Sequence, residues 1–155
     1  MPSLLQAEIK QSKPFATRGA EALLGILRTA AVLDHELQDA MKPFGVTPTQ
    51  HNVLRILRGA GEAGLCGREV AERMVARVPD VPRMLERLEA MALITRERDA
   101  EDRRHVTARI ARKGLDLLDR IEPVLREVER HRTGGLSDRS LAALVAGLDA
   151  VRTGR

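Results

Sequence analysis

The feature that most constrains the fold of this chain is the order of patterns between Leu65 and Arg112. Two short segments with apolar residues at helical spacing come first, and two segments that alternate apolar and charged residues follow. Helical spacing predicts helices at about 67–75 and 79–92, and alternation predicts a β-hairpin at about 95–110. A hairpin directly after two short helices predicts a winged helix-turn-helix.

Local signals mark where the two short helices begin. Cys66-Gly67-Arg68-Glu69 has the spacing of a capping box, with a thiol where Ser or Thr is usual. Pro79 suits a first helical turn, because the first helical N–H groups have no partner inside the helix. In the second helix, Arg83 and Arg87 lie four residues apart and therefore project from one side, opposite the apolar face.

Three pieces of this run together resemble the MarR family of bacterial winged-helix regulators. They are PRMLERLE at 82–89, LITR at 93–96 and DAEDRR at 99–104, and the resemblance extends over roughly residues 20–152. It implies a mainly α-helical homodimer with a small β-hairpin wing, dimeric through long N- and C-terminal helices. It further implies a transcriptional repressor that binds a pseudo-palindromic operator in double-stranded DNA and is released by a small-molecule effector of unknown identity.

The chain departs from the family pattern at three positions. Pro82 and Ala111 stand where the family commonly has Thr, and Ala92 stands where it has Gly. Pro82 removes a hydroxyl that could contact DNA, so the operator sequence cannot be carried over. Ala92 predicts that the turn after the second helix avoids positive φ, and Ala111 removes an expected cap from the next helix.

Arginines dominate the predicted DNA contacts. Arg83 suits base edges or phosphate, since a guanidinium fork can bond both. By resemblance, Arg96 grips phosphate and Arg104 reaches into the minor groove, with Asp102 orienting an arginine. The full predicted set is Arg68, Arg77, Asp80, Pro82, Arg83, Arg87, Arg96, Asp102, Arg103 and Arg104. The open alternative is that these are solvated charges, with Arg83 and Arg87 paired to Glu86 or Glu89.

The outer parts of the chain predict an arm and long dimerisation helices. We expect an arm at 1–16 and one domain at 17–155, with the winged helix-turn-helix at about 47–111 and dimerisation helices at about 18–42 and 112–152. Thr47 and Ser137 predict helix caps, and Pro123 predicts a kink near 119–122. An apolar stripe wider than one partner helix can cover predicts contacts with a second subunit. The predicted dimer contacts are Leu23, Leu27, Leu141, Leu144 and Leu148.

Composition sets further bounds. A chain of 155 residues predicts one domain, and two Phe with no Trp or Tyr predict a core of aliphatic residues and Met, which favours helices. No apolar run approaches the roughly 18 residues of a membrane span, and no signal peptide is visible, so we expect a cytoplasmic protein. The net charge of +4 is compatible with nucleic acid but does not establish it.

The remaining alternatives concern catalysis, redox chemistry and metals. The single Cys excludes an intrachain disulfide, and the four His are scattered, so we expect no metal and no cofactor. Cys66 is either a redox sensor or a plain N-cap, and the cap is the favoured interpretation. No catalytic motif is present, which predicts that the chain is not an enzyme. A winged helix used only as a protein-interaction module, without DNA binding, stays open.

Overall fold

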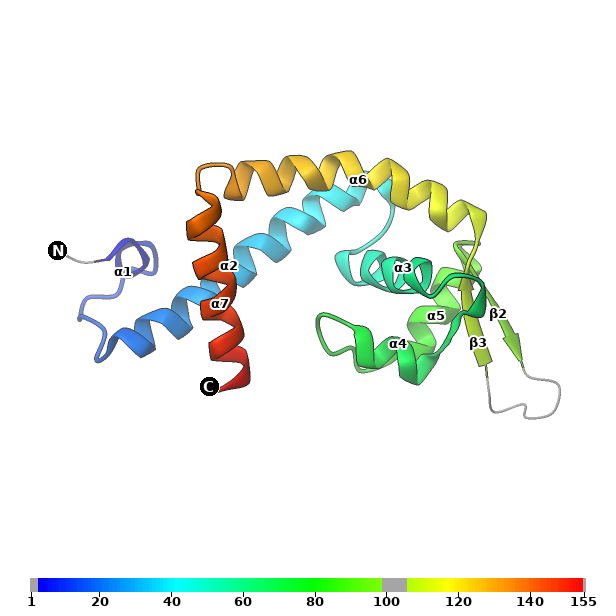
Figure 1. The fold of residues 1–155 in the computed structure, drawn as a ribbon, viewed down its shortest axis with the longest axis horizontal. Coiled ribbons are helices and arrows are strands. Elements are labelled where there is room, and N and C mark those ends of the chain that lie inside the picture. The colour runs from blue at the N-terminus through cyan, green and yellow to red at the C-terminus, as the bar shows by residue number, and fades with distance from the viewer. Residues whose placement is uncertain (1–2, 99–105, 155) are drawn as a thin grey trace.

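The computed structural model describes residues 3–98 and 106–154 and arranges them as two lobes, which α2 and α6 connect (Figure 1). The predicted fold class, mainly α-helical with a small hairpin, is confirmed. The elements in order are α1 (Leu4–Glu8), α2 (Arg18–Met41), η1 (Lys42–Phe44), α3 (Pro48–Ala60), η2 (Gly61–Ala63), β1 (Leu65–Cys66), α4 (Gly67–Arg73), α5 (Val81–Ala90), β2 (Ile94–Arg98), β3 (Val106–Ile110), α6 (Arg112–Thr133) and α7 (Asp138–Thr153).

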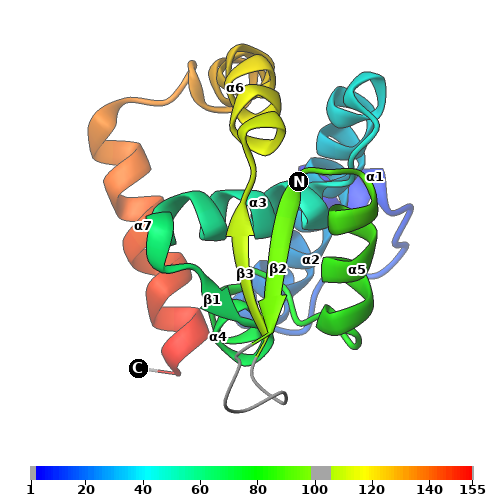
Figure 2. The same ribbon diagram turned by 90° about the vertical axis from the view of Figure 1, so that its right-hand side faces the viewer.

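One lobe is the winged helix, formed by α3, α4, α5 and a three-stranded antiparallel sheet in the order β1-β3-β2 (Figure 2). The two predicted strands pair in register from Ile94 with Ile110 to Arg98 with Val106. The third strand, β1, was not predicted, because two residues are too short to alternate. Leu65 pairs with Ala108 across this edge of the sheet.

The hydrophobic core of the described residues lies in the winged helix and in the adjoining ends of α2 and α6. No residue of α7 is buried, and Met41 is the buried residue of α2. The outer halves of the terminal helices therefore lie outside this core. The core residues are Met41, Val46, Val53, Leu54, Leu57, Leu65, Val70, Val81, Leu85, Leu88, Leu93, Ile94, Ala108, Leu117, Leu118 and Ile121.

Most helices begin where local capping signals predict. Thr47 and Gln50 form a capping box at α3, and the Ser137 hydroxyl accepts the Ser140 N–H at 3.2 Å at the start of α7. At α4, the Glu69 carboxylate accepts the Cys66 N–H at 2.8 Å, and this bond lowers the pKa of Glu69. The predicted start of α5 near residue 79 is two residues early, because the Asp80 carboxylate accepts the Arg83 N–H at 3.0 Å and makes Asp80 the N-cap.

The prediction for Ala92 is wrong. Its φ is +59°, in the left-handed region. The Leu93 N–H donates to the Leu88 carbonyl at 3.0 Å, and the Ala92 N–H donates to the Glu89 carbonyl at 2.8 Å. These two bonds form a Schellman motif, which ends α5 and satisfies its last carbonyls. The buried Leu93 must follow at once, so the geometry of the turn prevails over the preference of Ala for negative φ, at a cost of roughly 1–2 kcal/mol.

The second long helix, α6, stays continuous through Pro123, and its axis changes direction near its middle (Figure 1). The structure agrees with the predicted loss of a cap at Ala111, whose side chain makes no capping bond.

At the other end of the chain, α1 contacts α2 through an ion pair between Glu8 and Arg28 at 3.6 Å. Within the described residues, no helix is long and apolar enough to cross a membrane.

Candidate nucleic-acid interface

The α5 helix has one buried and one exposed face, as its sequence predicts. Val81, Leu85 and Leu88 are buried, whereas Arg83 and Arg87 are exposed. Among the residues that the structure describes, no acidic side chain forms an ion pair with Arg83 or Arg87. The winged-helix core therefore holds α5 from behind and leaves both guanidinium groups facing outward.

The carboxylates expected to neutralise those arginines are held elsewhere. Glu89 accepts a hydrogen bond from the Arg96 Nε at 2.8 Å, and a Glu86 oxygen lies 3.9 Å from an Arg96 terminal nitrogen. The Arg96 side chain is only 23% exposed. This cluster fastens β2 to α5 and carries two acids for one base, so its geometry favours a positioning role for Arg96. Phosphate contact by Arg96 stays a prediction.

Asp80 and Pro82 occupy the start of α5, and both are exposed. The Asp80 carboxylate is already used as the helix cap, where a negative charge is favourable. Pro82 lies at one of the first two helical positions, where the missing N–H leaves no carbonyl without a partner. Both residues therefore fix where α5 begins, and with it the direction in which Arg83 leaves the helix.

Of the other predicted DNA contacts, Arg68 and Arg77 lie within the described residues and three lie outside them. Arg68 is exposed and pairs with Glu72 at 3.0 Å, one turn along α4. Arg77 is exposed in the connection between α4 and α5. The predicted tip residues Asp102, Arg103 and Arg104 lie outside the described residues.

Lys113 contacts the end of α5 and was not predicted. Its ammonium donates to the Met91 carbonyl at 2.9 Å, at the C-cap of the helix. A cation is favourable there because the C-terminal end of a helix carries partial negative charge. Lys113 and Met91 lie 22 positions apart in the sequence, so no local sequence signal predicts this contact. It ties the start of α6 to the end of α5.

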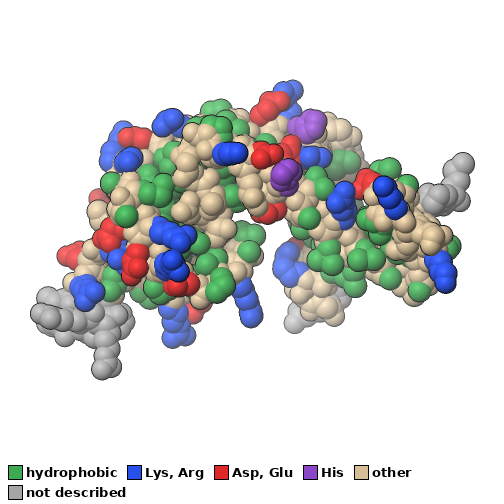
Figure 3. Space-filling view, turned by 180° about the vertical axis from the view of Figure 1, so that it is seen from behind, with side chains coloured by type: hydrophobic (Ala, Val, Ile, Leu, Met, Phe, Trp, Pro, Cys, Tyr) green, Lys and Arg blue, Asp and Glu red, His purple; other side chains and the backbone are tan. Residues whose placement is uncertain are grey.

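Charge is unevenly distributed over the surface. Figure 3 shows Lys and Arg side chains along the lower edge of the winged-helix lobe and apolar side chains gathered on the other lobe.

The histidines do not form a metal site in the part of the chain that the structure describes. Within the winged-helix core, burial together with Arg55 and Arg58 lowers the pKa of His51. His51 is thus a core residue that favours its neutral form. No metal-binding group of three side chains occurs among the residues described.

The terminal helices expose large apolar side chains. Of the predicted dimer contacts, Leu23, Leu27, Leu144 and Leu148 are exposed, by 54%, 65%, 50% and 37% respectively, and Leu141 is partly buried. Leu24 in α2 and Val145 and Val151 in α7 are exposed as well. Several large exposed apolar side chains along one helix mark a surface for contact with another molecule.

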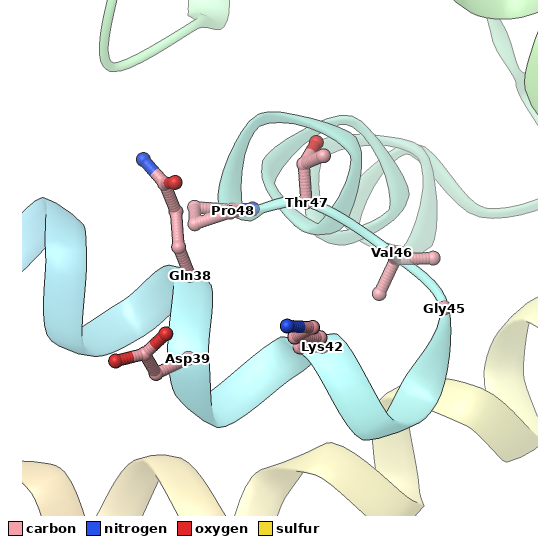
Figure 4. A pocket seen from close by; sticks show the side chains of 7 residues that line it. All are labelled: Gln38, Asp39, Lys42, Gly45, Val46, Thr47 and Pro48. Atoms are coloured by element: carbon pink, nitrogen blue, oxygen red, sulfur yellow. The ribbon is translucent and has the colours of Figure 1, made fainter.

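A cavity of about 410 Å³ lies where α2 ends and α3 begins (Figure 4). It is open to solvent and is lined by one ammonium, one carboxylate and a few apolar groups. Its lining residues are Gln38, Asp39, Lys42, Gly45, Val46, Thr47 and Pro48.

Comparison with known proteins agrees with this geometry. Residues 46–106 match the model of the MarR family. The chain is 31% identical over 94 residues to YkoM of Bacillus subtilis, an uncharacterized HTH-type transcriptional regulator, and this match covers 61% of the chain and 59% of YkoM. The chain thus spans less than two thirds of the length of that relative.

Two solved structures extend the comparison. A MarR transcription factor from Planctomyces limnophilus is 28% identical, with a TM-score of 0.68 over 87% of this chain and 98% of that one. MepR of S. aureus, in complex with DNA, is 23% identical, with a TM-score of 0.74 over 84% of this chain and 96% of that one. The resemblance expected from the sequence is therefore confirmed.

Proposed function

We propose that this chain, which carries a MarR-family winged helix over residues 46–106, is a sequence-specific regulator of transcription that binds double-stranded DNA as a homodimer. The observation that carries this proposal is the outward face of α5, where Arg83 and Arg87 are exposed while Glu86 and Glu89 are held by Arg96. The relatives with this winged helix are regulators of transcription, which supports binding without catalysis.

In this proposal, α5 enters the major groove and the wing lies over the adjacent minor groove. Arg83 stands in the first turn of α5, the part of a recognition helix that meets base edges. Arg104, outside the described residues, keeps its predicted place in the minor groove, where narrow A·T tracts concentrate negative potential. Arg87 lies one turn further along α5 and suits phosphate or a base edge.

The second copy of the chain would cover the exposed apolar surface of α2 and α7. Leu27 in α2 and Leu144 in α7 are each at least half exposed, and neighbouring apolar side chains on the same helices are exposed too, which is costly unless another molecule covers them. A two-fold dimer presents the same surface from each subunit and sets two α5 helices in fixed relation. Its operator would then be pseudo-palindromic, with half-sites about one helical turn apart.

Control by a small molecule fits the same arrangement. The cavity at the α2–α3 junction lies between the proposed dimer lobe and the winged helix. A ligand that binds there and shifts α3 against α2 would change the spacing of the two α5 helices and release the operator, as in a repressor. Such a regulator works where the DNA is, in the cytoplasm. The proposal does not specify the ligand beyond a small molecule.

The test is a titration against the gene's own upstream region and a shuffled duplex of equal length. Wild-type protein should prefer the upstream duplex, and Arg83→Ala should weaken that binding by about 1–3 kcal/mol and relax preference at one or two base pairs. Arg139→Ala, at an exposed arginine of α7, is the matched control and should bind as wild type does.

Three results would contradict the proposal. Equal affinity of the wild type for both duplexes would remove sequence specificity. Binding by Arg83→Ala equal to wild type would mean that the DNA-binding surface is assigned wrongly. If no duplex is bound at all, the winged helix serves as a protein-interaction module instead.

A further inference from the structure

The connection between α4 and α5, residues 74–80, is the least supported part of the helix-turn-helix. It contains no helix or strand. Met74 and Val78 are partly buried, but the side chain of Val75 is 89% exposed, and Ala76, Arg77 and Pro79 are exposed as well. Two half-buried side chains alone would leave the shape of this connection weakly defined. That shape matters, because it leads directly into the Asp80 cap of α5.

One hydrogen bond from a distant element fastens this connection. The Asn52 side-chain oxygen, Oδ1, accepts the N–H of Val75 at 3.0 Å, across 23 residues of sequence. Asn52 lies in the second turn of α3, between the buried His51 and Val53, the latter with no exposed surface. Its backbone is therefore held by the core, and its side chain is a fixed anchor. Among the described residues, no other side-chain hydrogen bond joins α3 to this connection.

We propose that Asn52 is a positioning residue for DNA binding, one that sets the angle of α5 by holding the backbone at Val75. The inference rests on the proposed function. Val75 is five residues before the α5 cap, so a change in its position alters the direction in which α5 enters the groove. Arg83 and Arg87 are carried on α5 and move with it.

A purely structural role for Asn52 makes a different prediction. Val75 lies in an exposed connection, so water can replace Asn52 as the partner of its N–H, and the net contribution of such a bond to global stability is small. If the bond only satisfied an amide, its loss would change neither stability nor DNA affinity by much. If it defines the connection, its loss weakens DNA binding while the melting temperature stays almost the same.

The test compares an isosteric variant without an acceptor with one that keeps the acceptor. Asn52→Leu preserves size but cannot accept the Val75 N–H, whereas Asn52→Asp retains an oxygen there. Two quantities are measured for each: hydrogen exchange of the Val75 amide by NMR, and affinity for the upstream duplex. Asn52→Leu should speed the exchange about five- to tenfold and weaken DNA binding by a similar factor, the equivalent of one such bond.

The conservative variant should rescue both readouts. Asn52→Asp adds a negative charge that opposes DNA, but this effect should fade as salt is raised, whereas the loss in Asn52→Leu should persist. Arg55→Ala, at an exposed residue one turn along α3, is a control for the Val75 amide and should leave its exchange unchanged. Asn52→Ala is the second acceptor-free variant, used if Asn52→Leu lowers the melting temperature.

Each other outcome overturns the inference. Unchanged Val75 exchange in both acceptor-free variants would mean that the bond does not hold the backbone in solution. Faster exchange with unchanged DNA affinity would mean that the bond positions nothing that DNA binding requires. A wild type that binds no duplex would refute the proposed function, and the inference with it, and this result is distinct because it appears before any substitution is made.

Discussion

The two lobes differ in how far their leucine side chains are exposed. In the winged helix, Leu54 and Leu57 have no exposed surface, whereas Leu27 in α2 is 65% exposed and Leu144 in α7 is 50% exposed. The winged helix therefore completes a core within one chain. The terminal helices do not, since α7 has no buried residue. One lobe is thus specified by packing within the chain, whereas the apolar side chains of the other lobe stay exposed, and we propose that a second copy of the chain covers them.

This comparison separates the determinants of stability, assembly and DNA binding. A substitution in the winged-helix core should act on folding at every protein concentration. A substitution on the exposed stripe should act on the monomer–dimer equilibrium. A substitution on the outer face of α5 should change the affinity for DNA without changing folding or dimerisation.

The largest expected effect is on assembly, at Leu27. Leu27→Asp places one unpaired charge from each subunit in the proposed interface, and each should cost about 3–5 kcal/mol. Sedimentation at micromolar concentration should show a dimer for the wild type and a monomer for this variant. Leu144→Asp should behave in the same way.

A matched control places the same charge on the other lobe. Ala63→Asp, at an exposed residue beside the winged helix, should remain a dimer. If the wild type is monomeric at micromolar concentration, or if Leu27→Asp stays dimeric, the exposed stripe is not the interface and the contrast between the lobes needs another explanation.

The next effect is on folding, at Leu54. Leu54→Ala removes a fully buried side chain from the winged-helix core and should lower the free energy of unfolding by about 2–5 kcal/mol. Urea unfolding at two protein concentrations measures it. Leu23→Ala is the control, because its loss should be small and should vary with protein concentration. Equal losses for the two variants would abolish the distinction between the lobes.

The sequence predicts those features of the fold that depend on neighbouring residues, and it misses those that depend on residues far along the chain. Capping by Thr47 and Ser137 is a short-range effect, so the sequence placed the starts of α3 and α7 correctly. The positive φ of Ala92 was missed because it depends on the burial of Leu93, which must follow directly after the end of α5. The strand β1 was missed because its two residues are too few to show alternation and its pairing partner, β3, lies more than 40 residues further along the chain.

In the candidate site, too, the sequence predicts local features and misses contacts between separate segments. Helical spacing predicted that Arg83 and Arg87 share an exposed face, and they do. It could not predict that Glu89 pairs with Arg96, because that contact depends on how β2 packs against α5. Nor could it predict the cap at Met91 by Lys113 or the bond between Asn52 and Val75. These contacts join distant segments, so only the folded chain reveals them.

A smaller effect is expected for substitution of Arg96, and it distinguishes a positioning role from a phosphate contact. Because its partly exposed guanidinium is paired with Glu89, Arg96→Ala should lower the free energy of unfolding by about 0.5–1 kcal/mol. DNA binding should weaken because the wing loses its link to α5, but the salt dependence of binding should keep its slope. The measurement is a titration at several salt concentrations. A slope flatter by about one unit would instead show a phosphate contact.

The smallest expected effect is at Cys66. As a cap beside Glu69, it should be replaced without loss by Ser, the better N-cap, with the free energy of unfolding unchanged or higher by a few tenths to about 1 kcal/mol. Thermal unfolding of Cys66→Ser measures this. DNA binding with and without peroxide should match the wild type. If peroxide releases DNA from the wild type and not from the variant, Cys66 is a redox sensor.

In the proposed complex, the terminal helices hold two winged helices at a fixed spacing on DNA. Inserting about five base pairs between the half-sites turns one half-site to the opposite side of the duplex, where the second winged helix cannot reach it. We expect two chains bound to each intact site, measured by sedimentation of the complex, and loss of most of the specific affinity after the insertion. One chain per site, or equal affinity for the two duplexes, would contradict the proposed complex.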